Sequence, residues 1–353
     1  MKHYHLKVKE VIQETPEAVT ISFWHPLSEM IKYEAGQFLT LLLTINGEKV
    51  RRSYSMSSSP HTDTAPAVTV KRVPGGLVSN WLIDNIKVDD FIEVLEPIGH
   101  FIVKPDARNA RTVVLIGAGS GVTPLISIAK SVLKIEPDSR VVLLYGSRNE
   151  TTVIFKQQLA EMLAQFGTRF VLHHSLSQPI NGWKGATGRL NQTQILRLLE
   201  DVEDLSATSA EFYLCGPDEM MNEAKRALEI LKVPIEQVHR ESFATATTHQ
   251  PVHEEGDDDE SLKAQDVTVL YEGSEYKFKV EPHQTILEAA LDLDIDLPYS
   301  CQAGMCTACM GKCTSGKVQL DEEDGLTKAE LTAGFILTCV AHPLTKDVVV
   351  EIE

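Results

Sequence analysis

The sequence predicts a multidomain protein that consists of an antiparallel β-barrel, an α/β domain with a parallel sheet, and a small α+β domain. Three observations predict this order. Strand-like runs fill residues 1–103, strands and helices alternate over residues 108–243, and four of the six cysteines lie within residues 301–313. A chain of 353 residues is also too long for one ordinary hydrophobic core.

The barrel is predicted for residues 1–105. Its runs are rich in β-branched and aromatic residues, alternate in part between apolar and polar positions, and are separated by Gly, Asn and Pro. They read HLKVKEVI, AVTISFW, QFLTLLLTI, AVTVKRV and FIEVLEPI, and a short helix is expected in GLVSNWLIDN. Several strands at this spacing are typical of an antiparallel barrel.

The α/β domain is predicted for residues 106–243. The buried-type strands RTVVLIGAG, RVVLLYGSR, RFVLHHSLS and EFYLCGP alternate with helical runs such as TPLISIAKSVLK and DEMMNEAKRALEIL. Strands that alternate with helices in this way form a parallel sheet with helices on both faces.

The third part of the chain has two segments. Residues 244–264 are polar, strongly acidic and nearly free of large apolar residues, so they cannot bury a core and are expected to form a flexible linker. Residues 265–353 begin with the hairpin-like strands DVTVLYEG and EYKFKVE, continue with a helix near TILEAALDL, and end on the strand DVVVEIE after the cysteines.

Charge and hydropathy exclude several classes of protein. The net charge of −17 argues against a nucleic-acid-binding protein, because phosphate binding needs a basic face. It indicates either solubility alone or docking to a basic partner protein. No run approaches eighteen apolar residues, and the first ten residues have no apolar signal region. We expect no membrane association, a cytoplasmic location, and metal or redox roles for the cysteines.

The cysteine cluster has the spacing of a plant-type 2Fe-2S site. Cys301, Cys306 and Cys309 follow the pattern C-x4-C-x2-C, and Cys339 is available as the fourth thiolate. A structural zinc site or a disulfide pair is the alternative, but there is no second C-x2-C arm. PYSCQAGMCTACMGKCTSGKV and GFILTCVAHP resemble the plant-type ferredoxin family, which implies a β-grasp fold and these four ligands, with Cys313 at a non-ligand position.

A second motif, RRSYSMSS at residues 51–58, combines groups suited to a flavin nucleotide. An arginine can bind a pyrophosphate, a tyrosine can cover an aromatic ring, and a serine can hydrogen-bond a ring nitrogen. An ordinary strand with alternating polar residues would look the same. The segment VKRVPGGLVSNWL follows, in which a Gly-Gly turn leads into a helix N-terminus that can bind phosphate.

Together with EPIGHF at residues 96–101, these motifs resemble the FAD-binding barrel of the ferredoxin–NADP reductase superfamily. The resemblance implies that Arg52 contacts the FAD pyrophosphate, Tyr54 packs on the isoalloxazine and Ser55 approaches its N5. HRESF at residues 239–243 implies that Glu241 or Phe243 lies near the flavin ring. Further residues implied to line the flavin or hold its phosphate are Val70, Lys71, Arg72, Gly76, Leu77, Val78 and Ser79.

The α/β domain carries a glycine-rich turn in VVLIGAGSGVTPLIS. The glycines permit a close backbone approach to a pyrophosphate, and the next helix presents its positive end. The turn departs from both the dehydrogenase fingerprint and the P-loop, and a tight turn without a ligand is the alternative. The proline-terminated version resembles the same superfamily, which implies that the cofactor-binding residues are Gly119, Ser120, Gly121, Thr123 and Pro124.

A Cys-Gly-Pro turn in YLCGPDEMM also resembles that superfamily. There Cys215, Gly216 and Pro217 are implied to lie beside the nicotinamide, although Cys215 alone could be an ordinary buried cysteine. The implied catalytic set is therefore Ser55, Cys215 and Glu241.

The choice of nucleotide depends on the end of the second α/β strand, LLYGSRN. An acidic residue there would favour NADH, whereas Ser147 and Arg148 suit the 2′-phosphate of NADPH. Arg189 could assist, while Glu150 opposes this interpretation and Arg148 could be a surface residue. We expect NADPH, with NADH possible.

The order of flavin, nucleotide and ferredoxin blocks resembles the reductase components of multicomponent bacterial oxygenases, including those of phenylacetate-type aromatic degradation. This implies an oxidoreductase that takes a hydride from NADPH onto FAD and passes single electrons through a 2Fe-2S cluster to an oxygenase component. The alternatives are a stand-alone reductase that serves a separate carrier, and a non-enzymatic module that binds zinc and a nucleotide.

We predict that Cys313→Ser keeps the cluster and the activity, whereas Cys339→Ser loses both the cluster and electron transfer to a one-electron acceptor, because the cluster needs four ligands. Visible absorbance, electron paramagnetic resonance and NADPH-dependent cytochrome c reduction measure the outcome. Loss of the iron–sulfur signal in the Cys313 variant would show that the fourth ligand is wrongly assigned.

Overall fold

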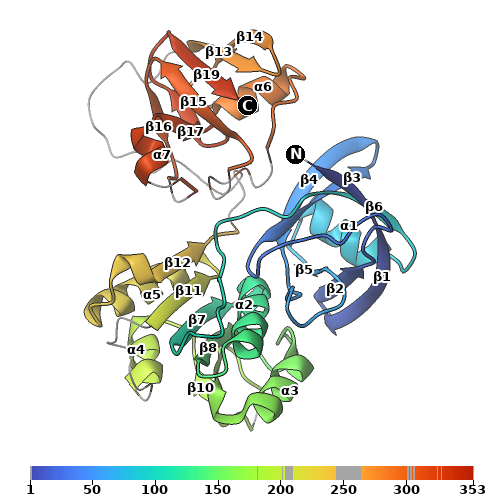
Figure 1. Cartoon of the computed structure of the whole chain (residues 1–353), viewed down its shortest axis with the longest axis vertical. Coiled ribbons are helices and arrows are strands. Elements are labelled where there is room, and N and C mark those ends of the chain that lie inside the picture. Colours follow the sequence, from blue (N-terminus) through green and yellow to red (C-terminus); the bar gives the residue numbers. More distant parts are fainter. Residues whose placement is uncertain are drawn as a thin grey trace. The chain divides into compact units, whose positions relative to one another are not determined.

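A computed structural model describes most of the chain, and it divides into two compact units, Met1–Phe243 and Ala244–Glu353 (Figure 1). The described residues are 2–180, 182–200, 202, 210–243, 264–299, 302, 304, 307–323, 325–326 and 328–352. All of the predicted linker 244–264 except Ala264 lies outside them.

The first part of the first unit is an antiparallel barrel sheet of six strands in the order β4-β3-β6-β1-β2-β5, as predicted. Alternate residues of these strands face a common core with helix α1, which contributes Val78 and Leu82. The elements are β1 (His3–Thr15), β2 (Ala18–Phe23), β3 (Phe38–Ile45), β4 (Glu48–Ser55), β5 (Ala67–Lys71), α1 (Leu77–Asn85) and β6 (Phe91–Leu95).

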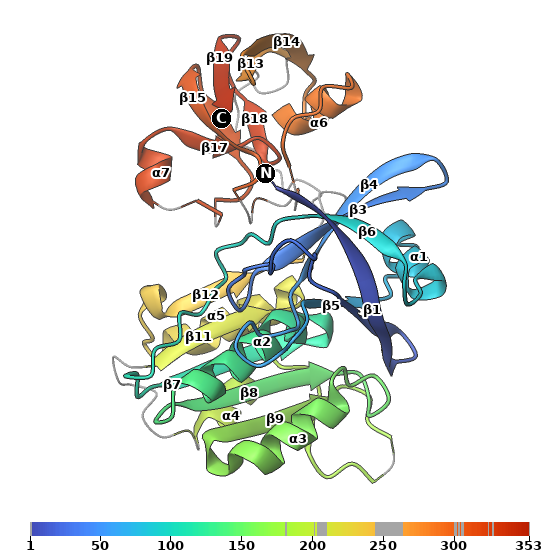
Figure 2. The ribbon, with the colours of Figure 1, turned by 45° about the vertical axis from the view of Figure 1, so that its right-hand side comes forward.

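The second part of this unit is a parallel sheet in the order β10-β9-β8-β7-β11-β12. Helices α2 and α3 pack on one face, and α4 and α5 pack on the other (Figure 2). Its strands are β7 (Thr112–Ala118), β8 (Arg140–Ser147), β9 (Phe170–Leu176), β10 (Ala186–Thr187), β11 (Ala210–Cys215) and β12 (Val238–Glu241). Its helices are α2 (Val122–Ile135), α3 (Lys156–Phe166), α4 (Gln192–Glu200) and α5 (Asp218–Ile230), with short 3-10 turns at Gly119–Gly121, Gly167–Arg169 and Ile235–Gln237.

Helix α2 is the most enclosed helix of this unit, because it packs on the sheet and also against barrel residues. Its core cluster joins Leu125, Ile128 and Val132 of the helix to Ala35 and Phe101 of the barrel part. The two parts of the first unit therefore share one hydrophobic cluster.

The second unit is an α+β domain with a mixed sheet in the order β14-β13-β19-β15-β17 and a separate β16-β18 pair. Helix α6 begins at a capping box, in which Thr285 Oγ1 accepts a hydrogen bond from Glu288 N (3.1 Å) and Thr285 N donates to Glu288 Oε2 (2.9 Å). The elements are β13 (Gln265–Tyr271), β14 (Ser274–Val280), α6 (Ile286–Asp292), β15 (Met310–Ser315), β16 (Val318–Leu320), α7 (Lys328–Thr332), β17 (Phe335–Leu337), β18 (Ala341–Pro343) and β19 (Val348–Ile352).

None of the helices in the described residues is both long and apolar enough to cross a membrane.

A buried ion-pair network ties the amino edge of the parallel sheet to the end of α2. Arg111 Nη2 lies 2.8 Å from Glu136 Oε1, and Arg111 Nη1 lies 2.6 Å from Glu211 Oε1. Glu136 is fully buried and also accepts hydrogen bonds from Ser139 Oγ and Asn109 Nδ2. Burial opposes the charged form, but Arg111 and these hydrogen bonds outweigh it and lower the pKa of Glu136.

We predict that Glu136→Gln destabilises the first unit by about 3 kcal/mol, because it leaves the Arg111 charge without its buried partner. Since the pKa of Glu136 is lowered in the folded state, its contribution is full above the ordinary glutamate pKa and is lost as the pH falls through the folded value. Thermal unfolding at several pH values measures the difference.

The matched control for this experiment is Glu219→Gln. Glu219 pairs with Arg189, but these side chains are 76% and 78% exposed, so the change should cost less than about 1 kcal/mol. Equal losses in the two variants would contradict the assignment of stability to the buried network.

Candidate active site and cluster domain

The predicted flavin motif lies on strand β4, which pairs with β3 so that Tyr54 is opposite Leu39 and Ser55 is opposite Phe38. Arg52 is exposed and Tyr54 is half-buried. Residues two positions apart on a strand lie on the same face, so the guanidinium and the ring line one side of β4. Burial raises the pKa of Tyr54, which keeps the phenol neutral at physiological pH.

The three predicted catalytic residues come together from three strands of the first unit. Ser55 Oγ donates a hydrogen bond to Glu241 Oε2 (3.0 Å). Glu241 and Cys215 are register partners in the parallel pairing of β12 with β11. All three side chains are buried. The carboxyl ends of these strands therefore place a hydroxyl, a carboxylate and a thiol beside one another at the junction of barrel and sheet.

Cys215 is held as a neutral thiol. It is fully buried, and burial followed by the charge of Glu241 raises the pKa of its thiol well above the ordinary value. Gly216 and Pro217 follow it directly, and α5 begins at the next residue, as the sequence predicts. Phe243, two residues after Glu241, is 42% exposed.

The glycine-rich turn connects β7 to α2. A Cβ atom on Gly121 would lie 2.0 Å from the carbonyl oxygen of Cys215, so only glycine fits there. Gly119 has a φ of 57°, in the left-handed region that favours glycine. Thr123 Oγ1 donates to Ser120 O (2.9 Å), and Pro124 is buried in the first turn of α2.

The helix that follows this turn has no side-chain cap at its amino end. The positive dipole end of α2 suits an anionic pyrophosphate, so the turn fits the predicted nucleotide.

Lys71, at the end of β5, reaches this turn rather than remaining within the barrel. A Cβ atom placed on Gly119 would lie 3.1 Å from Lys71 Nζ. Burial and the nearby charge of Arg148 lower the pKa of Lys71, while Glu17 opposes the change. Lys71 and Arg148 are thus two cations that repel one another beside a glycine turn. Both can donate hydrogen bonds to a phosphate group.

The predicted FAD phosphate site lies at the start of α1. Gly76 occupies the N-cap position without a side-chain cap, which leaves N–H groups of the first turn available. Ser79 is buried and its Oγ accepts a hydrogen bond from Val73 N (3.1 Å). Val78 is also buried, whereas Leu77 is 45% exposed.

Two residues predicted to line the flavin have other contacts. The Arg72 guanidinium forms a bidentate pair with Asp84 of α1 at 2.6 and 3.2 Å and also donates to Asn80 Oδ1. Val70 is fully buried in the barrel core.

The end of strand β8 carries the residues predicted to select the nucleotide. Ser147 is buried, and its Oγ lies 3.1 Å from His174 Nε2. Arg148 is exposed. Arg189 pairs with Glu219 at 2.9 Å, and Glu150 Oε2 accepts a hydrogen bond from Ile180 N.

Sequence reasoning missed His174, which lies on β9 opposite Tyr145. Its ring stacks on that tyrosine with a centroid separation of 4.9 Å. Burial, followed by the charge of Lys156, lowers the pKa of His174 to about 4, so the ring is neutral and its Nε2 orients the Ser147 hydroxyl. A predicted strand order would have placed β9 beside β8, and this would have brought His174 close to Ser147.

In the second unit, Cys309 and Cys339 are brought together by strands β15 and β17. Thr338 donates to the carbonyl oxygen of Cys309 through both its N and its Oγ1, each at 3.1 Å. Both cysteines are buried within the domain core. Two buried cysteines on adjoining segments suit the thiolate ligands of the predicted iron–sulfur cluster. Cys301 and Cys306 lie outside the described residues.

Cys313 lies further along β15, opposite Val350 of β19. Its Sγ donates to Ser315 O at 3.2 Å, and the side chain packs against the domain core.

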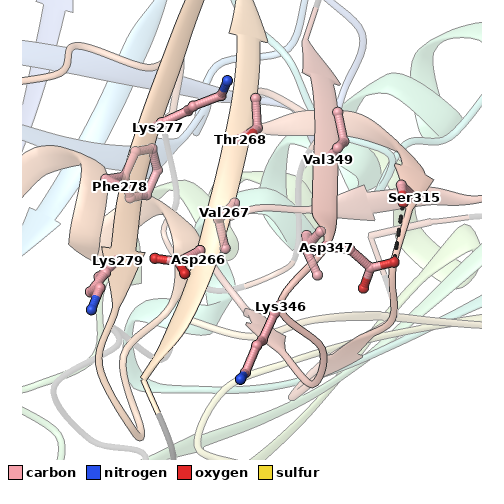
Figure 3. A pocket seen from close by; sticks show the side chains of 11 residues that line it. Asp266, Val267, Thr268, Lys277, Phe278, Lys279, Ser315, Lys346, Asp347 and Val349 are labelled. Atoms are coloured by element: carbon pink, nitrogen blue, oxygen red, sulfur yellow. Dashed lines mark hydrogen bonds between the residues drawn. The ribbon is translucent and has the colours of Figure 1, made fainter.

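A hollow of about 450 Å³ lies over β13, β14 and β19 of the second unit (Figure 3). Its lining mixes lysines with Asp266 and Asp347, and Ser315 Oγ donates to Asp347 Oδ2 at 3.4 Å. It contains none of the predicted ligands, and Cys309 and Cys339 flank β15 and β17 towards the other edge of the sheet. The mixed charge is typical of a solvated sheet face.

Three known protein families match successive parts of the chain. The family described as an oxidoreductase FAD-binding domain matches residues 4–102. An oxidoreductase NAD-binding domain matches residues 115–226, and a 2Fe-2S iron-sulfur cluster binding domain matches residues 269–344.

Similar proteins match this chain over nearly their whole length. The chain is 34% identical to a component of the 1,2-phenylacetyl-CoA epoxidase of Escherichia coli, over 99% of this chain and 97% of that protein. It is 36% identical to the ferredoxin reductase component of 3-ketosteroid-9-alpha-monooxygenase from Rhodococcus rhodochrous, over 98% of this chain and 96% of that protein. The fold matches phthalate dioxygenase reductase with a TM-score of 0.61 at 21% identity, covering 99% of this chain and 98% of that one.

The chain thus has FAD-binding, NAD-binding and 2Fe-2S domains. The first two meet where Ser55, Cys215 and Glu241 lie together, and the third contains the buried residues Cys309 and Cys339. The chain is an oxidoreductase of the ferredoxin–NADP reductase superfamily, and it belongs to the family of oxygenase reductases that carry a C-terminal plant-type 2Fe-2S domain.

Proposed function

We propose that this chain takes a hydride from NADPH onto FAD and delivers the two electrons one at a time, through its 2Fe-2S cluster, to a separate oxygenase component. The observation that carries the proposal is the meeting of Ser55, Glu241 and Cys215 beside the glycine turn of α2. The cofactors supply the hydride and electron transfers, and the protein binds and orients them.

Within this site each side chain has a proposed role. Arg52 binds the FAD pyrophosphate and Tyr54 covers the isoalloxazine ring. Ser55 is oriented by its 3.0 Å hydrogen bond to Glu241, so this pair can hold or move a proton at Ser55 Oγ next to the flavin. Cys215 is a small neutral thiol. Its size leaves room for the nicotinamide, and it adds no negative charge that would hinder the transfer of a hydride to the flavin.

The remaining proposed cofactor contacts follow the elements that carry them. Gly76 to Ser79 hold FAD phosphate at the start of α1, and Gly119 to Pro124 hold the nicotinamide dinucleotide at the start of α2. Cys301, Cys306, Cys309 and Cys339 are the proposed cluster ligands.

The proposed acceptor is an oxygenase component. The similar proteins from Escherichia coli and Rhodococcus rhodochrous are named as parts of an epoxidase and a monooxygenase, which supports an oxygenase partner and a role in aromatic degradation of the phenylacetate type. The proposed location is the cytosol, where thiols stay reduced, as a cluster held by four thiolates requires.

NADPH is the proposed donor because Arg148 and Lys71 place two cations near the turn that binds the dinucleotide. The neutral His174 holds Ser147 in position beside Arg148. A 2′-phosphate would find one hydroxyl and one guanidinium there, and the guanidinium can form two parallel hydrogen bonds with it.

The visible spectrum of the purified protein tests the proposed function directly. We predict flavin bands with a broad iron–sulfur shoulder, and bleaching of both when NADPH is added without oxygen. Chelation or acid removal of iron should abolish the shoulder and the transfer to a one-electron acceptor, while reduction of the flavin by NADPH persists. A colourless protein would contradict the proposal.

We predict that Arg148→Ala raises the KM for NADPH about tenfold and leaves the KM for NADH nearly unchanged, because a charge-assisted hydrogen bond contributes about 1.5–3 kcal/mol. Steady-state ferricyanide reduction with each nucleotide measures the two values. Arg108→Ala is the matched control, since Arg108 is an exposed arginine paired with Asp106. Equal effects on both nucleotides would contradict the assignment of Arg148 to the 2′-phosphate.

A further inference from the structure

Three polar side chains are buried on one face of helix α2. Ser127, Lys130 and Ser131 are spaced so that they lie side by side on a helix, and none is more than 8% exposed. Buried polar groups destabilise a fold unless they find hydrogen-bond partners. The partners of these three side chains therefore indicate what this face of α2 contacts.

Their partners are three consecutive residues, Ser57 and Ser58 at the end of the flavin motif and Ser59 directly after it. Lys130 Nζ donates to Ser57 O at 2.9 Å, and Ser127 Oγ donates to Ser58 O at 2.6 Å. Ser131 Oγ lies 2.7 Å from Ser59 Oγ. The helix of the nucleotide domain is thus bonded residue by residue to the segment that begins two positions after Ser55.

Asp63 completes this contact as the counter-ion of Lys130. Its Oδ2 lies 2.5 Å from Lys130 Nζ and also accepts a hydrogen bond from Ser59 N at 2.6 Å. Burial lowers the pKa of Lys130, while the charge of Asp63, its hydrogen bond and the charge of Glu14 oppose this change. We call Ser127, Lys130, Ser131, Ser57–Ser59 and Asp63 the α2 latch.

A second connection leaves the α2 latch at Ser57. Thr69 Oγ1 donates to Ser57 Oγ at 2.8 Å and lies 2.8 Å from Thr20 Oγ1, and Thr20 Oγ1 donates to Glu14 Oε1. Glu14 Oε2 accepts from Phe155 N at 3.2 Å, at the start of α3. Phe155 has a φ of 61°, an uncommon conformation for a bulky residue. Barrel and nucleotide domain are therefore joined at α3 as well as at α2.

The position of the α2 latch relates it to the hydride-transfer step. It begins two residues after Ser55 on one side, and on the other side it lies in the helix that follows Gly119–Gly121 directly. The bonds of the α2 latch join α2 to residues that follow directly after β4, so they constrain the distance between the predicted flavin edge and the glycine turn at the start of α2. Reacting atoms must lie about 3–3.5 Å apart, and a misplacement of about 1 Å can cost about a hundredfold in rate.

The ion pair of Lys130 and Asp63 is partly buried, with side chains 10% and 31% exposed, and stability alone does not account for it. Replacing such a pair by apolar residues of similar volume is often neutral or stabilising, because desolvation of the charges offsets their attraction. The ion pair differs from apolar packing because its contacts are directional: Lys130 Nζ donates to one carbonyl at 2.9 Å and to one carboxylate at 2.5 Å.

Building on the proposed function, we propose that Lys130, together with Asp63, is a positioning residue for hydride transfer that sets the approach of the nicotinamide to the flavin. It acts through Ser57–Ser59 and α2, and it binds neither nucleotide itself. Its loss should slow the hydride step and leave the affinity for NADPH almost unchanged.

The test is anaerobic stopped-flow reduction of the FAD-loaded protein by NADPH, comparing the wild type with Lys130→Met. We expect the limiting rate of flavin reduction to fall about tenfold to a hundredfold, with the Kd for NADPH changing less than about twofold. Lys134→Met is the matched control, because Lys134 is exposed on the same helix, and its limiting rate should equal that of the wild type. An unchanged limiting rate in Lys130→Met overturns the proposal.

The double variant Lys130→Met, Asp63→Leu separates positioning from stability. Removing the unpaired carboxylate should restore the melting temperature towards that of the wild type, while flavin reduction stays slow. Recovery of the rate together with stability would show a purely structural role and overturn the proposal.

Two further measurements keep the test decisive. If Lys130→Met does not fold, Asp63→Asn removes the counter-ion of Lys130 and should slow flavin reduction severalfold; an unchanged limiting rate in that variant overturns the proposal. Wild-type protein that NADPH does not reduce would refute the proposed function itself, whereas normal wild-type reduction with an unaffected Lys130 variant refutes only the positioning role.

Discussion

The enclosure of helix α2 between the barrel and the parallel sheet is the packing on which the first unit depends. Leu125, Ile128 and Val132 share one cluster with Ala35 and Phe101, while Lys130 donates a hydrogen bond to Ser57 O at the end of the flavin motif. Apolar contact of this kind is strong but has no preferred direction. Hydrogen bonds from α2 to the carbonyl groups of Ser57 and Ser58 are directional, so the barrel and the nucleotide domain meet in one orientation.

That orientation brings the chemically active edge together. The carbonyl of Cys215 approaches so closely that position 121 must be glycine, and the same strand ends beside Glu241, which accepts the hydrogen bond of Ser55. Burial keeps the thiol of Cys215 protonated. A parallel sheet places its strand ends along one edge, which is where ligands bind in folds of this type. The barrel closes this edge from the other side.

In the second unit, most of the proposed cluster ligands are close together in the sequence. Three of its four proposed cluster ligands lie within a few residues of one another, and only Cys339 must be brought from a distance. Pairing of β15 with β17 and the two bonds from Thr338 to the Cys309 carbonyl bring the chain at Cys339 alongside the chain at Cys309. The capping box at Thr285 and the parallel pairing of β13 with β19 complete an α+β core of ordinary composition.

The sequence by itself determined the order of the three domains, the strands and helices of the α/β part, the glycine turn and the cysteine spacing. Short stretches of sequence predict each of these features, because periodicity, turn residues and ligand spacing are local properties of the chain. Only the tertiary structure decided that Ser55 meets Glu241, that Lys71 reaches Gly119, that His174 orients Ser147, and that Lys130 pairs with Asp63. These pairs join residues far apart in the sequence, and a single chain records no signal of a contact that arises only when separate strands and helices pack together.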